Sequence, residues 1–238
     1  MASAQRTWCV ANPLSNSSAL LANLDFACSH VDCRLIQQGG SCFYPNTHIH
    51  HASFAMNLYF QTMGRHSSHC DFRGSGLVSL TDPSYESCSF LSGKYACSLS
   101  IFIQFSKETW CVAKPGTSEY MLQQNINYAC NHVDCSPTHD GGSCFNPTTL
   151  INHASFAMNL YFQNSGRNTT SCDFRSTGLI VVKDPSKPNL FQFFPKFNCN
   201  PDFENGQDSK SGFAFAFAGY GNCTYGYESG NSGVRGRW

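Results

Sequence analysis

The length, charge and cysteine content of the chain exclude several classes of protein. The sequence has 238 residues, and its 15 basic residues balance its 15 acidic ones. A broad nucleic-acid surface needs clustered Lys and Arg, so no nucleic-acid partner is expected. No apolar run approaches the roughly 18 residues of a transmembrane helix. The 14 cysteines predict a disulfide framework made in an oxidising compartment, although no signal peptide is visible in the polar segment Met1–Thr7.

Two copies of one module make up most of the sequence. More than half of the positions in Thr7–Ser84 are identical in Thr109–Ser186, and the segment His51–Gln61 recurs unchanged. Five cysteines recur at a constant spacing of 102 positions: Cys9, Cys28, Cys33, Cys42 and Cys70 become Cys111, Cys130, Cys135, Cys144 and Cys172. Because each copy has only about 80 residues, its core is small and internal crosslinks are expected.

The first half of each copy predicts a strand and then a helix. The apolar, β-prone stretch Thr7–Ala11 predicts the strand. The stretch Ser15–Cys28 begins with a capping residue and carries Leu20, Leu24 and Ala27 at helical spacing, which predicts the helix. In the second copy, Thr117 is the expected cap. A tight loop and a Gly-rich turn region follow.

A second helix is predicted to begin at Asn46 or Thr47 and to run through Gln61, with Gly64 ending it. This helix is apolar on almost every side, so we expect it to be the central buried element. Its polar stripe consists of His50, Ser53, Asn57 and Gln61.

The remaining segments complete the expected domain organisation. The stretch Phe72–Leu80 alternates weakly and predicts a strand or hairpin. The first module is expected at residues 7–90, a linker at 91–108 and the second module at 109–186. The tail, 187–238, is rich in Gly, Ser, Asn and Phe and is expected to have little fixed structure.

Neither a metal site nor a cofactor site is predicted. The segment His48–His51 holds three histidines, but two of their equivalents in the second copy are Leu150 and Asn152. A zinc site at Cys28 and Cys33 is less favoured than a disulfide, because single cysteines follow instead of a second close pair.

Comparing the two copies also argues against catalysis. Glycoside hydrolysis usually needs two carboxylates about 5–10 Å apart. None of the five glutamates is shared between the copies. Among the shared acids, Asp82 belongs to a turn and Asp32 lies between two closely spaced cysteines, which leaves Asp71 without a partner. No Gly-x-Ser-x-Gly motif is present. The repeat is therefore predicted to be non-catalytic.

The motifs of the repeat, in their order, resemble a known family. They are Trp-Cys-Val-Ala, Cys-x4-Cys, Gly-Gly-Ser-Cys-Phe-x-Pro, His-Ala-Ser-Phe-Ala-Met-Asn-Leu-Tyr-Phe-Gln and Cys-Asp-Phe. They are similar to the plant X8 domain, carbohydrate-binding module family 43, over about 160 residues in tandem. Such domains occur at the C-terminus of plant endo-1,3-β-glucanases and alone in plasmodesmatal callose-binding proteins. The resemblance implies an α+β fold of two small disulfide-stapled modules, each with two helices packed on a small antiparallel sheet, and it implies binding to β-1,3-glucan.

The resemblance also implies a disulfide pattern in which the first cysteine pairs with the fifth, the second with the third and the fourth with the sixth. The implied bridges are Cys9–Cys70, Cys28–Cys33 and Cys42–Cys88 in the first copy, and Cys111–Cys172 and Cys130–Cys135 in the second. Leu190 occupies the position that matches Cys88, so Cys199, nine residues later, is the expected partner of Cys144. Cys97 and Cys223 are then left over.

Aromatic faces and planar polar groups are what a sugar-binding surface requires. Trp8 and Phe54 are more typical of a core. Tyr59 and Phe60 are consecutive and cannot both face one core, so one of them, or the polar stripe beside it, should reach the surface. The expected binding residues are Asn57, Tyr59, Phe60, Gln61, Arg65 and Asp71, with Asn159, Tyr161, Phe162, Gln163, Arg167 and Asp173 in the second copy.

These observations predict a non-catalytic β-1,3-glucan (callose) binding protein, extracellular in the plant cell wall or at plasmodesmata. One alternative is a detached ancillary part of an endo-1,3-β-glucanase, and another is a disulfide-rich structural module without glycan affinity. Three glycosylation sequons, at Asn16, Asn168 and Asn222, are compatible with a secreted glycoprotein. The two copies are expected to bind one glucan chain together across a flexible linker.

Overall fold

The computed structural model describes residues 6–92, 108–187 and 223–226. In each repeat a short strand is followed by two α-helices and a closing strand. The first repeat contains β1 (Trp8–Ala11), α1 (Ser17–Cys28), α2 (His48–Thr62) and β2 (Gly76–Ser79). The second contains β3 (Trp110–Ala113), α3 (Glu119–Cys130), α4 (Leu150–Asn164) and β4 (Gly178–Val181). This confirms the α+β class and the presence of two small modules, each crosslinked by its own disulfides.

Side-chain caps fix where the helices begin. The Asn16 side chain accepts a hydrogen bond from the Ala19 N–H, and Ser118 caps α3 in the same way. The caps are therefore one residue further on than the Ser15 and Thr117 positions that the sequence predicts, because the capping oxygen must reach the amide three residues later.

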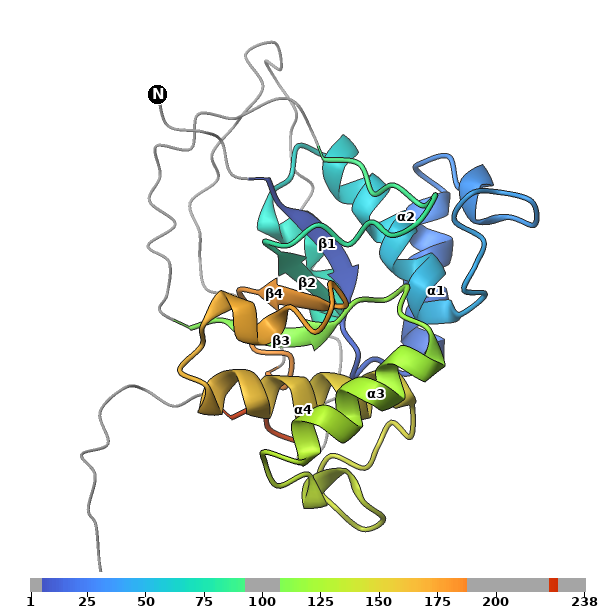
Figure 1. The fold of residues 1–238 in the computed structure, drawn as a ribbon. Helices are drawn as coiled ribbons and strands as arrows, with labels where there is room; N and C mark the ends of the chain where they lie inside the picture. The colour runs from blue at the N-terminus through green and yellow to red at the C-terminus, as the bar shows by residue number, and fades with distance from the viewer. Residues whose placement is uncertain (1–5, 93–107, 188–222, 227–238) are drawn as a thin grey trace, which may run out of the picture.

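The strands of both repeats form one antiparallel sheet in the order β1-β2-β4-β3 (Figure 1). Strands β2 and β4 meet at its centre, where Ser79 lies opposite Val181. Two repeats that share a sheet are not independent, which differs from the expectation of flexibly joined modules. Most of the expected linker, 91–108, lies outside the described residues.

Helices α2 and α4 lie beside the two outer strands and satisfy their open edges. In the first repeat, Ser53 Oγ accepts from the Ala11 N–H at 2.9 Å, Asn57 Oδ1 accepts from the Cys9 N–H at 3.1 Å, and Gln61 Nε2 donates to the Thr7 carbonyl at 2.9 Å. Ser155, Asn159 and Gln163 make the same three contacts with the edge of β3. Unpaired backbone groups at a sheet edge need such partners. The polar stripe of the second helix therefore closes the sheet.

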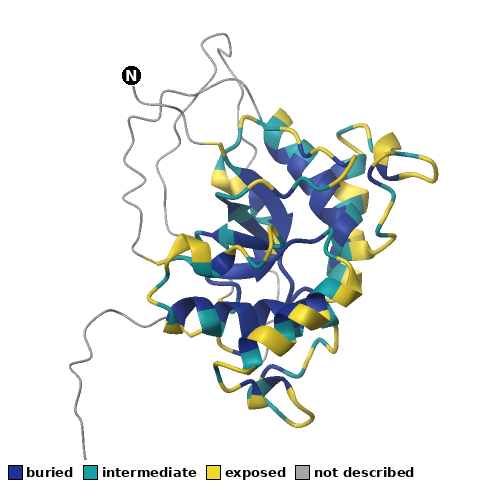
Figure 2. Cartoon of the chain, in the orientation of Figure 1, coloured by how far each residue is buried: buried dark blue, intermediate teal, exposed yellow. Residues whose placement is uncertain are grey.

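The hydrophobic core crosses the boundary between the repeats. Val10, Leu14 and Leu77 of the first repeat belong to one buried cluster with Val112 and Leu179 of the second. Figure 2 shows that burial is concentrated in the strands and on the helix faces turned toward them. Separating the repeats would expose this cluster to water, so burial of apolar area favours the docked arrangement.

Six disulfides lie within the described residues, and five of them follow the pairing that the resemblance implies. The sixth joins Cys144 to Cys223, so the expected partner Cys199 is wrong. Cys97 and Cys199 lie outside the described residues.

A short segment near the C-terminus completes the second module. Tyr225 packs edge-on against Phe156 with ring centroids 5.7 Å apart, just as Phe90 packs against Phe54 at 5.4 Å. Residues 223–226 therefore occupy the place that residues 88–91 occupy in the first module.

The backbone contacts of this segment agree with that placement. Ser186 Oγ accepts from the Tyr225 N–H, and its counterpart Ser84 Oγ accepts from the Phe90 N–H. The prediction of little fixed structure over 187–238 is therefore wrong for residues 223–226. The rest of that tail beyond Lys187 lies outside the described residues.

Candidate functional site

Half of the predicted binding residues belong to the interior or to the sheet edge. Phe60 and Phe162 are each only 1% exposed, and Asn57 and Asn159 are no more exposed than that. Gln61 and Gln163 donate to the Thr7 and Thr109 carbonyls, just before β1 and β3. These six side chains do not form an exposed face. The Asn and Gln side chains face an open strand edge instead of solvent, and Phe60 and Phe162 lie in buried hydrophobic clusters.

The remaining predicted polar residues do not gather into one site. Asp71 forms an ion pair with Lys183 of the other module, while its counterpart Asp173 is exposed and accepts a hydrogen bond from the Ser176 N–H. Arg65 and Arg167 are partly buried just beyond the second helix of their modules, with positive φ angles of 61° and 59°.

Tyr59 is the predicted residue that does reach a partly exposed aromatic cluster in the first module. Its ring centroid lies 5.2 Å from Phe26, 5.5 Å from His30 and 5.7 Å from Phe72. Phe26 is 45% exposed. Phe26 comes from the last turn of α1 and His30 from the turn just after it, Tyr59 from α2, and Phe72 from the turn that follows Cys70. We call Phe26, His30, Tyr59 and Phe72 the first quartet.

The second module repeats this cluster. Tyr128, His132, Tyr161 and Phe174 form the second quartet, and Tyr128 is 50% exposed. The distances from Tyr161 to the other three rings are 5.3, 5.4 and 5.7 Å, within about 0.2 Å of those in the first quartet. In addition, the Tyr128 and Tyr161 hydroxyls are hydrogen-bonded at 3.1 Å.

The backbone holds the last member of each quartet in an unusual conformation. Phe72 and Phe174 have φ angles of 43° and 42°, which L-residues with bulky side chains rarely adopt. Strain of this kind costs on the order of 1–3 kcal/mol and clusters at functional sites. The disulfide from Cys9 to Cys70, two residues before Phe72, helps to hold this turn in place.

The two histidines are oriented by the last turn of the helix that precedes each of them. His30 Nδ1 and His132 Nδ1 each lie 2.8 Å from the carbonyl four residues earlier. A carbonyl only accepts, so Nδ1 carries the proton and Nε2 is left as an acceptor in the neutral ring. Each quartet therefore offers apolar ring faces together with polar atoms, the combination that stacks on a sugar ring and reads its hydroxyls.

Sequence reasoning missed Phe26 and His30 as members of the site. The signal was present, because an aromatic residue and a histidine recur at i and i+4 in both copies, as Tyr128 and His132 show. A helix face on its own, however, does not reveal what its residues meet across the neighbouring helix.

The described ranges contain no group of three or more His, Cys, Asp or Glu side chains arranged to hold a metal ion. None of their helices is long and apolar enough to cross a bilayer. Asn16 and Asn168 are exposed and remain predicted glycosylation sites, while Asn222 lies outside these ranges.

The fold and the duplicated quartets define a tandem of two disulfide-stapled modules, each with a partly exposed aromatic cluster. The X8 domain family matches residues 7–77 and 109–179, and the chain belongs to this family.

Several relatives match one module of the chain. It is 52% identical over 77 residues to a glucan endo-1,3-beta-glucosidase of Triticum aestivum, a match that covers 32% of this chain and 17% of that protein. It is 48% identical over 79 residues to major pollen allergen Ole e 10 of Olea europaea, covering 32% and 64%. It is 46% identical over 79 residues to plasmodesmata callose-binding protein 2 of Arabidopsis thaliana, covering 33% and 41%. The matches therefore span less than two thirds of each relative, and no solved structure matches the chain significantly.

Proposed function

We propose that this chain binds β-1,3-glucan without hydrolysing it, through its two aromatic quartets. The observation that carries the proposal is the duplication: two exposed clusters keep the same ring spacing even though Phe26 becomes Tyr128. The rings come from three separate segments of each module, so their common arrangement depends on the whole fold. A surface of this kind suits a ligand with repeating apolar ring faces and hydroxyls.

The names of the relatives support the same ligand class. Two of them are described as acting on, or binding, a 1,3-linked glucan. The callose-binding relatives also support placing this protein outside the cell, in the wall or at plasmodesmata.

Non-catalytic binding agrees with the position of the shared acids. Asp71 is engaged by Lys183, whereas Asp173 is exposed on the other module. The wheat enzyme matches over only 17% of its length, which favours catalysis elsewhere in that protein. The same match makes an ancillary part of a larger glucanase the second candidate for this chain.

Binding can be tested by pull-down of the full chain with insoluble β-1,3-glucan, with cellulose as the comparison polymer. We expect the protein to be retained on the 1,3-glucan and not on cellulose, and to release no reducing sugar. The double variant Tyr59→Ala/Tyr161→Ala removes one ring from each quartet and should lose at least tenfold in affinity. Tyr120→Ala is the matched control, because Tyr120 is 72% exposed and lies outside both quartets. Equal retention of the wild type and the double variant would contradict the assignment of the site.

A further inference from the structure

We propose that the two quartets bind two separate glucan chains, so that one protein molecule links them; this rests on the proposed function. The two modules form one body. Strands β2 and β4 pair across the boundary, and the N-terminal part of α2 reaches the other module, where Ile49 packs against the buried cluster that contains Ile151. The relation between the quartets is therefore set by the fold.

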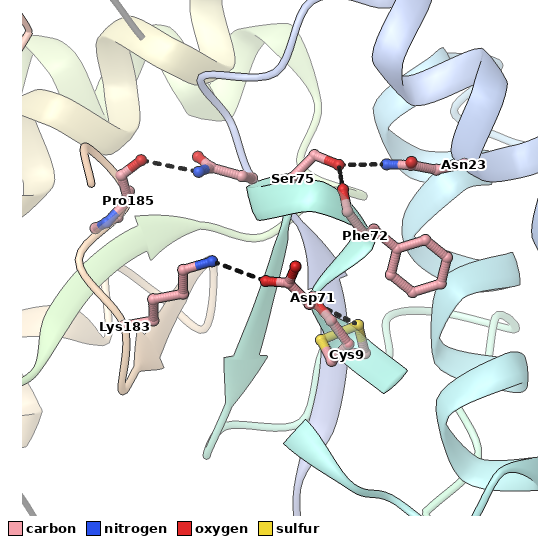
Figure 3. A network of polar contacts seen from close by, with 9 residues as sticks. Cys9, Asn23, Asp71, Phe72, Ser75, Lys183 and Pro185 are labelled. Atoms are coloured by element: carbon pink, nitrogen blue, oxygen red, sulfur yellow. Dashed lines mark hydrogen bonds and ion pairs between the residues drawn. A yellow bond between two sulfur atoms is a disulfide. The ribbon is translucent and has the colours of Figure 1, made fainter. Parts of the chain in front are cut away.

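Polar contacts fix the same boundary. Asp71 and Lys183 form an ion pair across it (Figure 3). The fully buried Asn12 donates from Nδ2 to the Pro185 carbonyl at 2.8 Å. Lys114, which occupies the position of Asn12 in the second repeat, donates from Nζ to a carbonyl of the first module at 3.1 Å. Reciprocal contacts of this kind hold both modules in place.

The boundary has approximate twofold symmetry. Ser79 and Val181 are equivalent positions of the two repeats, and they lie opposite each other. The Leu80 N–H donates to the Ile180 carbonyl, and the equivalent Val182 N–H donates to the Val78 carbonyl. A rotation of half a turn about an axis between β2 and β4 therefore exchanges the modules and their quartets.

This symmetry conflicts with the binding of one straight chain by both quartets. A glucan chain has direction, because its two ends differ chemically. Equivalent sites bind chains whose directions are related by the same half-turn. Only a line parallel to the axis keeps its direction under that rotation, and such a line cannot pass through two points that the rotation exchanges. One straight chain therefore cannot occupy both quartets in the same way, whereas two chains can.

The placement of the helices agrees with separate sites. Each quartet takes members from the C-terminal end of one helix and the later part of the next. Figure 1 shows the C-terminal ends of α2 and α4 at different ends of the body. Two separate chains joined by one protein thus fit this arrangement, unlike the expected binding of a single straight chain by both copies.

A capture experiment with the full chain tests the bridge. Long-chain biotinylated laminarin is bound to beads at low density, the protein is added, and fluorescent laminarin of the same length follows. Recruitment of fluorescence that depends on the protein is the expected result. Tyr59→Ala or Tyr161→Ala alone should still bind the beads but reduce recruitment at least tenfold, while Tyr120→Ala should behave as wild type.

Each other outcome decides the question. If the protein is retained on the beads without recruiting fluorescence, either one chain occupies both quartets or only one quartet binds; in both cases the bridge is wrong, although glucan binding stands. Undiminished recruitment by the single-quartet variants would show that other surfaces make the bridge, which overturns the assignment. Failure of the protein to bind the beads at all would remove the proposed function, and the bridge with it.

Discussion

Asp71 Oδ1 of the first module and Lys183 Nζ of the second lie 3.5 Å apart, and their side chains are only 19% and 23% exposed (Figure 3). The equivalent positions are Asp173 and Thr81, so the twofold symmetry of the interface is broken here. Burial lowers the pKa of the Lys183 ammonium, and the nearby Asp71 carboxylate opposes that shift. The ion pair thus links the two modules at a single place, and no symmetry-related copy of it exists.

We expect Asp71→Asn to lower the free energy of unfolding by about 1–2 kcal/mol, between the values for exposed and fully buried pairs. In this variant the Lys183 ammonium remains partly buried, but beside a neutral amide instead of a carboxylate. Urea denaturation measures the change, and Asp173→Asn is the matched control because its carboxylate is exposed. Glucan binding should be unchanged in both variants. A loss of binding in Asp71→Asn alone would restore the sequence prediction that Asp71 belongs to the binding face.

His50 makes the first module sensitive to acid. Its Nε2 lies 3.0 Å from the Cys42 carbonyl, which requires a proton on that nitrogen. Its Nδ1 is buried and has no hydrogen-bond partner within the described ranges. Burial lowers the pKa of His50 to about 4, because a second proton would bring an unpaired charge into the interior.

Since the pKa of His50 is lower in the folded state than its ordinary value, the unfolded chain takes up the proton first. Stability should therefore be full near pH 7 and fall as the pH drops from about 6.5 to about 4. The loss approaches about 3 kcal/mol, at 1.36 kcal/mol for each pKa unit. His50→Asn introduces the residue type that the second module has at the equivalent position, Asn152. It should remove the contribution of His50 to the dependence of stability on pH. Denaturation midpoints over this pH range provide the measurement, and an unchanged slope would assign the effect to another group.

The Cys144–Cys223 bridge should be recovered by peptide mapping without reduction. Cys223→Ser should destabilise the second module by about 2–5 kcal/mol, the usual cost of losing a native bridge in a small domain. The segment that carries Tyr225 would then be held only by packing and by hydrogen bonds to Ser186 and Asn159. A linked peptide containing Cys144 and Cys199 would contradict the arrangement described above.

Tyr225→Phe should stabilise the protein by about 1 kcal/mol. The Tyr225 hydroxyl is buried and has no hydrogen-bond partner among the described residues, and burial raises its pKa. An unsatisfied buried hydroxyl is costly, whereas Phe90 fills the same place in the first module without one. Phe90→Tyr is the reciprocal variant and should lose stability. Thermal denaturation compares the two, and destabilisation by Tyr225→Phe would reveal an unrecognised partner for the hydroxyl.

The sequence by itself determined the repeated unit. The resemblance to the X8 family implied five of the bridges, while the constant spacing of the cysteines and of the segment His51–Gln61 established two equivalent modules and their order of strands and helices. These features depend on local periodicity and on short, repeated spacings, which a sequence displays directly.

Only the tertiary structure decided which side chains, cysteines and strands lie opposite one another. Helical periodicity defines the polar stripe of Asn57 and Gln61, but it does not say whether that stripe meets solvent or an open strand edge. Similarly, Phe26 joins Tyr59 only because α1 and α2 pack together. Sequence distance favoured Cys199 over Cys223, yet pairing depends on where the intervening chain returns. The docking of β2 on β4 was also hidden, since backbone hydrogen bonds between modules leave little trace in side-chain patterns.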